Sequence, residues 1–197
     1  MISIVDYGAG NLRSVQNTLA EIGAPYKLID DAADLAKATK LILPGVGHFG
    51  QIMRSLDAMR VRQPLLDYIQ SGRPFLGICI GMQGLYEGSE EDETVRGLGV
   101  FSGRIRRFPK DARVPHMGWN LIERRGESAL TAELPARPFL YFANSYFAPV
   151  QAEAVAACEY HGEFAAAVQR ESIWGVQFHP EKSGALGLQV MRNFAEC

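Results

Sequence analysis

Cys79 lies between two glycines in Gly77-Ile-Cys-Ile-Gly81, directly after the apolar run of residues 75–78. A G-x-nucleophile-x-G pattern places its central residue on a tight turn between a strand and a helix, because glycines remove side-chain clashes there. A thiol on such a turn projects above the carboxyl edge of a sheet, and the N-terminus of the next helix favours its thiolate form. The pattern predicts a cysteine nucleophile, against the common alternative of a buried free cysteine.

His179 and Glu181 follow a second apolar run, in Val176-Gln-Phe-His-Pro-Glu181. Alternate residues of an extended segment point to the same side, so the imidazole and the carboxylate can be neighbours. A cysteine nucleophile needs a base, and the base needs a group that fixes its orientation. We therefore expect Cys79, His179 and Glu181 to form a catalytic triad. No second ligand cluster accompanies His179, so we expect no metal site.

A glycine loop, Pro44-Gly-Val-Gly47, follows the apolar residues 41–43. Two glycines allow the backbone N–H groups to turn toward one point, as an oxyanion hole requires. A simple β-turn is the alternative interpretation of this loop. The backbone groups expected to hold the oxyanion belong to Gly45, Val46, Gly47 and Ile80.

Gly8-Ala-Gly10 resembles the start of a dinucleotide-binding fingerprint, and Asp30 follows about 20 residues later. Arg13 occupies the place of the third glycine, and no Walker A sequence occurs. We therefore expect no nucleotide cofactor, and no other cofactor is indicated.

The elements that position these residues change in character along the chain. The first half alternates short strands with helical patterns, which predicts βαβ units and a mostly parallel sheet flanked by helices. Asn11 is the expected N-cap of the first helix, and Gly23 its end. The expected strands of this half are residues 2–5, 26–29, 41–43 and 75–78, and the expected helices are 12–22, 49–60 and 62–71.

The second half is rich in short strand-like runs and ends in one helical pattern at residues 184–195. We expect antiparallel strands that extend or decorate the central sheet. The predicted fold class is therefore α/β, as one domain over residues 1–197. The expected strands are residues 101–108, 119–123, 139–142, 155–160, 164–169 and 173–178.

Composition excludes several classes of function. Twenty basic against 22 acidic residues give a formal charge of −2, which offers no footprint for nucleic acid or an anionic membrane. No apolar stretch is long enough to span a membrane, residues 1–6 do not resemble a signal peptide, and the three cysteines have no CxxC spacing. We expect a cytoplasmic protein with reduced thiols. The acidic residues between 87 and 93 are expected to form a solvated loop, and His116 is expected to be structural.

Gly77-Ile-Cys-Ile-Gly-Met-Gln83 and Gln177-Phe-His-Pro-Glu181 together resemble the class I glutamine amidotransferases. Four segments are similar, more narrowly, to the glutaminase subunits of imidazole glycerol phosphate synthases of histidine biosynthesis. They are Asp6-Tyr-Gly-Ala-Gly-Asn11, Pro44-Gly-Val-Gly47, Pro115-His-Met-Gly-Trp-Asn120 and Phe178-His-Pro-Glu-Lys-Ser183. The similarity extends over essentially the whole chain.

This resemblance implies roles for individual residues. Cys79 would attack the side-chain amide of L-glutamine, with His179 as base and acid and Glu181 as its orienting group. Gly47, Gln83, Ser145 and Tyr146 would contact glutamine. Asn11, Trp119 and Lys182 would face a (β/α)8-barrel cyclase in a heterodimer. That partner would receive ammonia through a channel and form imidazole glycerol phosphate and an aminoimidazole carboxamide ribonucleotide.

The chain departs from this family pattern at Asn144, where the family usually has His, and at Ile80, where it usually has Leu. Three alternatives stay open on the sequence alone. The chain could be a related glutaminase that feeds another synthase, such as one that builds a sugar amidine. It could also be a stand-alone cysteine hydrolase or peptidase, or a binding subunit without activity.

Overall fold

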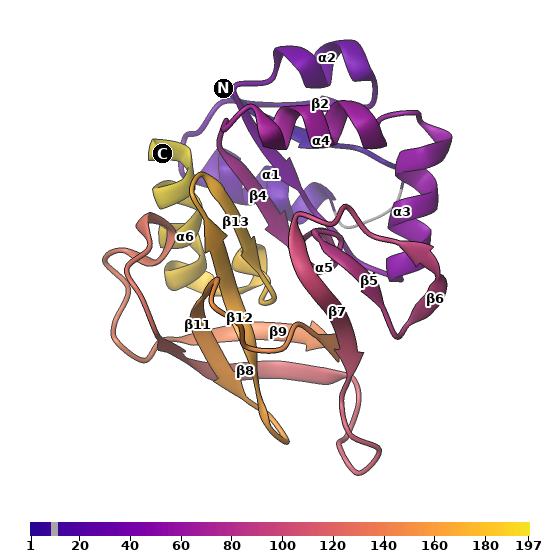
Figure 1. Ribbon diagram of the computed structural model, residues 1–197. Helices are drawn as coiled ribbons and strands as arrows, with labels where there is room; N and C mark the ends of the chain where they lie inside the picture. Colours follow the sequence, from indigo (N-terminus) through magenta and orange to yellow (C-terminus); the bar gives the residue numbers. More distant parts are fainter. Residues whose placement is uncertain (9–11) are drawn as a thin grey trace.

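The computed structural model describes residues 1–8 and 12–197, and a nine-stranded sheet forms its centre (Figure 1). The strand order is β2-β1-β3-β4-β13-β12-β11-β8-β9. The first five strands of this order pair in parallel and the remainder in antiparallel fashion. The α/β fold class with antiparallel strands added in the second half is thus confirmed.

The strands of the parallel half are covered by helices on both faces of the sheet. Because both faces are buried, the sequences of these strands are nearly continuous runs of apolar residues. Helix α1 contacts α6, while α2, α3 and α4 form a second connected group. Two groups of helices, one on each face of the sheet, are what right-handed crossovers between parallel strands produce. The strands are β1 (Ile2–Val5), β2 (Tyr26–Ile29), β3 (Lys40–Leu43), β4 (Phe75–Ile78) and β13 (Ile173–Val176). The helices are α1 (Leu12–Glu21), α2 (Ala32–Lys37), α3 (Phe49–Ala58), α4 (Arg62–Gln70) and α6 (Gly184–Glu196).

The antiparallel half continues the same sheet and crosses below the parallel half in Figure 1. A separate four-stranded sheet, in the order β10-β7-β5-β6, lies beside α3 and the short helix α5 (Ile80–Gln83). The antiparallel strands are β8 (His116–Arg124), β9 (Phe139–Asn144), β11 (Ala154–Glu159) and β12 (Glu163–Arg170). The smaller sheet has β5 (Tyr86–Ser89), β6 (Asp92–Arg96), β7 (Phe101–Arg107) and β10 (Tyr146–Phe147), and the 3-10 turns are η1 (Ala129–Thr131) and η2 (Pro180–Lys182).

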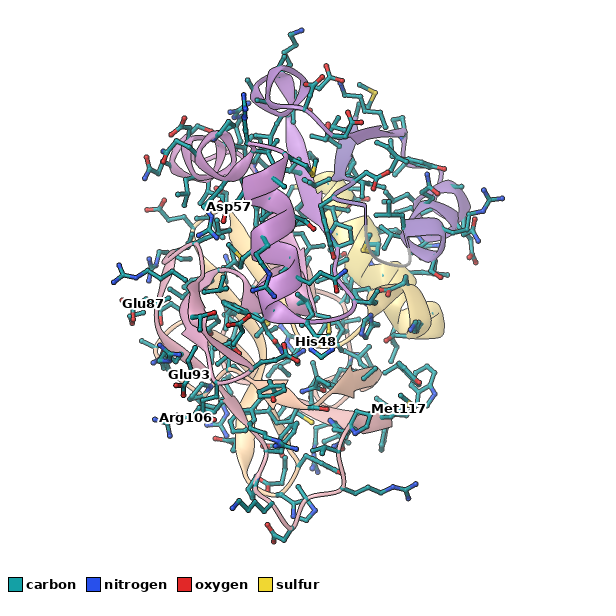
Figure 2. All side chains as sticks on the ribbon, turned by 90° about the vertical axis from the view of Figure 1, so that its right-hand side faces the viewer. His48, Asp57, Glu87, Glu93, Arg106 and Met117 are labelled. Carbon is teal, nitrogen blue, oxygen red and sulfur yellow. The ribbon has the colours of Figure 1, made fainter. Side chains whose placement is uncertain are left out.

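The expectation of a solvated loop at residues 87–93 is wrong, because this segment forms the hairpin of β5 and β6 (Figure 2). Its carboxylates bind groups that lie far away in the sequence. Glu87 accepts a hydrogen bond from the Gly103 amide at 2.8 Å, and Glu90 accepts one from the Arg107 amide at 2.8 Å. Asp92 pairs with Arg54 at 2.8 Å. These partners come from other elements, so the local charge pattern does not reveal them.

The beginning of α1 bears on one expectation. Asn11, expected both as its N-cap and at the partner interface, lies outside the described residues. Gly23 follows the helix with a φ of 72°, a conformation that suits glycine at a helix end. Within the described parts of the chain, no helix combines the length and the apolar character needed to cross a membrane.

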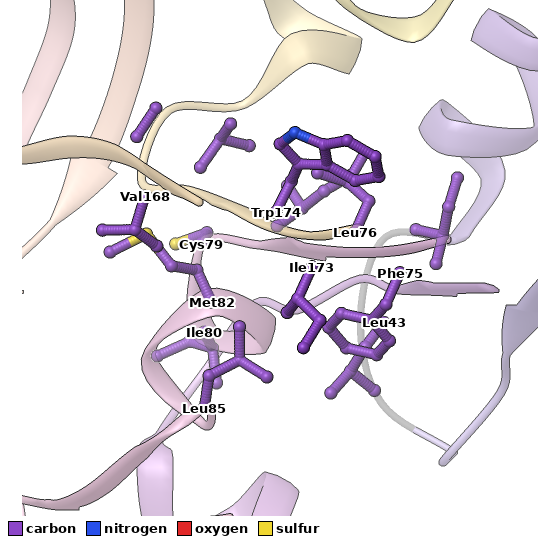
Figure 3. Packing of buried hydrophobic residues seen from close by; sticks show 14 of the residues in the cluster. Leu43, Phe75, Leu76, Cys79, Ile80, Met82, Leu85, Val168, Ile173 and Trp174 are labelled. Atoms are coloured by element: carbon purple, nitrogen blue, oxygen red, sulfur yellow. The ribbon is translucent and has the colours of Figure 1, made fainter. Parts of the chain in front are cut away.

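Three glycines allow the turn after β4 to pack closely against the glycine loop. A Cβ atom on Gly81 would lie 1.9 Å from the carbonyl oxygen of Leu43, and one on Gly45 would lie 2.8 Å from the Gly81 nitrogen. A Cβ on Gly77 would lie 2.7 Å from the Gly81 oxygen. Figure 3 shows Cys79 at this junction, with Ile80 and Met82 on the turn that follows it. The backbones of the glycine loop and of the turn after β4 are therefore closer together than they could be if these glycines carried side chains.

We therefore predict that Gly81→Ala lowers the free energy of unfolding by about 3 kcal/mol, because the methyl group meets rigid backbone. Urea unfolding followed by tryptophan fluorescence measures this change. Gly84→Ala is the matched control, since its nearest neighbour would be the Ile80 oxygen at 3.4 Å, an ordinary contact. An equal loss in both variants would contradict the packing argument.

Candidate active site

Three functional segments leave neighbouring strands at one edge of the sheet. The glycine loop follows β3, Cys79 follows β4 and His179 follows β13 by three residues. Strand β4 lies between the other two, with Leu43 opposite Gly77 and Val176 opposite Ile78. The carboxyl ends of these parallel strands therefore bring Cys79 between the glycine loop and His179.

Cys79 has the backbone conformation of a nucleophile turn. Its φ is 52° and its ψ is −108°, which is rare for a residue with a side chain. Such strain costs about 1–3 kcal/mol and persists only where the surroundings enforce it. The Cys79 amide donates to the Val176 carbonyl at 2.7 Å, and the Cys79 carbonyl accepts from the Gln83 amide at 3.0 Å. Both strand and helix thus hold the turn, although α5 is only four residues long.

The imidazole of His179 lies between Glu181 and Cys79. Its Nδ1 is 2.8 Å from Glu181 Oε1, and both side chains are at most 3% exposed. His179 and Cys79 also interact electrostatically, and because Nδ1 is used by Glu181, Nε2 is the nitrogen left for the thiol. Burial lowers the pKa of His179, but the charge of Cys79, its hydrogen bond and Glu181 raise it well above the ordinary value. These interactions favour the imidazolium form of His179.

Strand β9 holds the His179 segment in place. The His179 amide donates to the Tyr141 carbonyl at 2.8 Å. Ser183 Oγ donates to the His179 carbonyl at 2.7 Å and accepts from the Tyr141 amide at 3.0 Å. The edge strand of the antiparallel half therefore fixes the backbone of the candidate base.

A cavity of about 260 Å³ opens beside Cys79. This is just below the about 300–1,000 Å³ of sites for drug-sized ligands, so it suits a small substrate. Of the predicted site residues, Gly45 lies outside the lining and packs against Ile80, and Glu181 lies behind His179. The lining residues are Val46, Gly47, His48, Cys79, Ile80, Gln83, Glu91, Pro115, Ala143, Asn144, Ser145, Tyr146, His179 and Lys182.

Gln83 is buried and connects two parts of the site. Its Nε2 donates to the Tyr146 carbonyl and to Gln177 Oε1, each at 2.9 Å. Gln177 Nε2 in turn lies 3.5 Å from Cys79 Sγ. Gln177 was not among the predicted site residues. Its place two residues before His179, on the same side of an extended segment, is the signal that could have found it.

Glu91 and His48 were also missed. Glu91 accepts a hydrogen bond from the Phe49 amide at 2.6 Å and pairs with His48 Nδ1 at 2.9 Å. Both residues line the cavity, and His48 directly follows the glycine loop. The acidic run concealed Glu91, because its neighbours in sequence are also charged.

An exposed group, here called the aromatic rim, consists of Met117, Trp119, Tyr141 and Lys182. Met117 is 65% exposed and Trp119 is 54% exposed, and Met117 projects from the face seen in Figure 2. Trp119 meets Tyr141 edge to face, and Lys182 Nζ lies 5.8 Å from the centre of the Tyr141 ring. Lys182 also lines the cavity, so the aromatic rim adjoins its mouth. Exposed large apolar side chains gathered in this way are typical of a protein contact surface.

The arrangement carries the parts of nucleophilic acyl transfer: a thiol, a base with its orienting carboxylate, and a glycine loop at the place of an oxyanion hole. Among residues 1–8 and 12–197, no group of three or more His, Cys, Asp or Glu side chains is placed to hold a metal ion.

Comparison with known proteins gives consistent results. Residues 3–196 match the family model "Glutamine amidotransferase class-I". The imidazole glycerol phosphate synthase subunit HisH of Desulfitobacterium hafniense (strain DSM 10664 / DCB-2) is 43% identical, covering 100% of this chain and 94% of that protein. The subunit of the same name from Methanothermobacter thermautotrophicus is 45% identical over 100% of this chain and 98% of that protein. A crystal structure of a glutamine amidotransferase superimposes with a TM-score of 0.78 at 18% identity, covering 100% and 98% of the two chains, which concerns the fold alone.

We predict that Glu181→Gln lowers the pKa of His179. Glu181 raises the pKa of His179, so removing its charge lowers that pKa and the imidazolium is lost at a lower pH. The chemical shift of the His179 ring proton on Cε1, followed by NMR across pH, measures this pKa. Glu123→Gln, which affects a surface pair with Arg137, is the control, and an unchanged pKa in Glu181→Gln would contradict the coupling.

Proposed function

The chain belongs to the class I glutamine amidotransferase family, and from this we propose that it is the glutaminase subunit of an imidazole glycerol phosphate synthase in histidine biosynthesis. One observation carries the proposal: Cys79 lies between the glycine loop and the His179–Glu181 pair, in a chain that is 43% identical to such a subunit over its full length. We assign residues 1–197 to one glutaminase domain.

In the first step, the Cys79 thiolate attacks Cδ of the glutamine side chain. The carbonyl π electrons move to oxygen, and the amides of Val46, Gly47 and Ile80 are the groups proposed to hold this oxyanion, with Gly45 allowing their close approach. The imidazolium of His179 then gives its proton to the leaving nitrogen. The C–N bond breaks, ammonia leaves, and a glutamyl thioester forms on Cys79.

In the second step, neutral His179 takes a proton from water as the water oxygen attacks the thioester. The C–S bond breaks, the new side-chain carboxylic acid leaves and gives its proton to solvent to become glutamate, and the thiolate and imidazolium are restored. Glu181 keeps its contact with His179 Nδ1 in both steps and holds the ring in one orientation. The buried contact of 2.8 Å between His179 and Glu181 supports this role.

The cavity offers complementary groups to both ends of glutamine. Glu91 supplies a carboxylate for the α-ammonium group, and Gly47, Ser145 and Tyr146 supply backbone for the rest of the amino acid. Gln83 donates hydrogen bonds to the Tyr146 carbonyl and to Gln177, so it also contributes to substrate binding by fixing the position of the cavity wall at Tyr146.

Ammonia released into neutral water becomes ammonium, which is not a nucleophile. A glutaminase therefore needs an attached acceptor site, and we propose a cyclase of (β/α)8-barrel fold that docks on the aromatic rim as a heterodimer. Trp119 and Lys182 belong to this surface, and Lys182 also reaches the cavity. Asn11 is kept as a third interface residue from the sequence.

The test is glutamate release from glutamine by the chain alone and with a candidate barrel cyclase plus its nucleotide ligand. We expect low activity alone and a large rise when both are added. Strong activity alone that ignores the cyclase would contradict the partner assignment and favour a related glutaminase or a hydrolase.

Cys79→Ala provides the control for this test. It should abolish glutamine-dependent turnover, while turnover of the cyclase with added ammonium salt persists because the acceptor site is elsewhere. Retained glutamine hydrolysis would contradict the nucleophile assignment. Loss of both activities would show that the variant acts on folding or docking.

We predict that Trp119→Ala weakens association with the cyclase by about 2 kcal/mol, as expected for a central aromatic side chain at an interface. The weaker association appears as a higher Kd in calorimetry, while the rate of Cys79 alkylation in the free chain is unchanged. Leu28→Ala, which removes an exposed apolar side chain on β2 at the opposite edge of the sheet, is the control. Equal affinities of the Trp119 variant and the control would place the interface elsewhere.

A further inference from the structure

His116 and Asn144 are buried polar residues that the reaction described above does not use. They lie directly opposite each other on β8 and β9, and each is 5% exposed. The ring of His116 is stacked on Phe142 and Tyr160, with centroid distances of 5.1 and 4.1 Å. The imidazole therefore has one fixed orientation.

The neighbours of His116 determine which nitrogen carries its proton. Asn120 Oδ1 accepts from the Leu121 amide at 2.8 Å, which orients Asn120 Nδ2 toward His116 Nε2 at 3.2 Å. Asn120 Nδ2 is a donor, so Nε2 must accept and the proton is on Nδ1. Burial lowers the pKa of His116 to about 4, so the ring is neutral at pH 7.

Within the described part of the chain, His116 Nδ1 and Asn144 Oδ1 are both buried without a hydrogen-bond partner. The two residues lie directly opposite each other, so a donor on Nδ1 and an acceptor on Oδ1 are the complementary groups that this pair can bring together. Asn144 Nδ2 donates to the Tyr146 carbonyl at 3.0 Å.

The Tyr146 carbonyl is the point where this contact meets the site. It also accepts from Gln83 Nε2, which donates to Gln177 Oε1 as well, and Gln177 Nε2 donates to Cys79 Sγ. A continuous set of hydrogen bonds thus extends from Asn144 on β9 to the sulfur.

We propose that His116 and Asn144 are a positioning pair for glutamine hydrolysis. The pair fixes the Tyr146 wall of the cavity and, through Gln83 and Gln177, the donor that faces Cys79. This inference rests on the proposed function for the reaction that it serves. Strand β8 also carries Trp119 and Asn144 lines the cavity, so the pair lies between the aromatic rim and the nucleophile.

The test is a double-mutant cycle of Asn144→Leu and His116→Phe, which replace each side chain by an apolar one of similar shape. We expect each variant to lower kcat/KM for glutamine in the cyclase complex about ten-fold, the size expected when one buried hydrogen-bond partner is removed. The double variant should lose little more than either single one, because both remove the same contact. Alkylation of Cys79 by iodoacetamide, separated from Cys158 and Cys197 by peptide mass spectrometry, should also slow in each.

Asn193→Leu is the matched control. Asn193 is 8% exposed and its Nδ2 donates to the carbonyls of Leu130 and Ala132, so its loss costs stability far from Cys79. It should lower the melting temperature and leave kcat/KM and alkylation unchanged.

Several outcomes would overturn the inference. One is a loss of kcat/KM in the double variant that equals the sum of the two single losses in free energy. The others are an unchanged kcat/KM in His116→Phe, or an equal loss of kcat/KM in Asn193→Leu. A wild-type complex that does not hydrolyse glutamine would instead contradict the proposed function itself, and the positioning pair with it.

Discussion

The left-handed backbone at Cys79 is the constraint on which the rest of the site depends. A φ of 52° on a residue with a side chain is unfavourable, so the surrounding backbone must enforce it. Gly45, Gly77 and Gly81 allow that enforcement, because the glycine loop and the turn touch backbone to backbone. The same close packing brings the glycine loop and Cys79 to one cavity. The contacts that enforce the strained conformation of Cys79 therefore also fix the position of the loop beside it.

Strand β13 joins this arrangement to the second half of the chain. It pairs in parallel with β4 and in antiparallel fashion with β12, so His179 leaves the sheet where the two halves meet. The antiparallel strands then carry β9 back to the site, where the Tyr141 carbonyl accepts from the His179 amide. The candidate catalytic residues follow the ends of parallel strands, one wall of the cavity comes from β9 and the residues after it, and the aromatic rim comes from β8, β9 and η2.

Local patterns predicted the parts of the fold and site that depend on neighbours in sequence. The glycines around Cys79 predicted its turn, and the apolar runs predicted the strands that position it. Gln177 and Glu91 were missed because their contacts are with residues distant in the chain. The acidic segment was misassigned for the same reason, since Asp92 and Glu87 bind groups on other elements. A charge pattern shows that carboxylates are present but not which amide or guanidinium faces them.

The nucleophile turn and the proposed docking surface lie in different halves of the chain. The backbone of Cys79 is fixed by contacts between glycines in the parallel half, where a Cβ atom would already collide. A partner docked on the aromatic rim, as proposed above, would instead touch β8, β9 and the segment after His179, which also hold the Tyr146 wall and the base. Small movements of these strands would change the orientation of His179, Gln83 and Gln177 while the nucleophile turn stayed in place. Activation by docking would therefore act on the groups around the thiol and not on the turn that carries it.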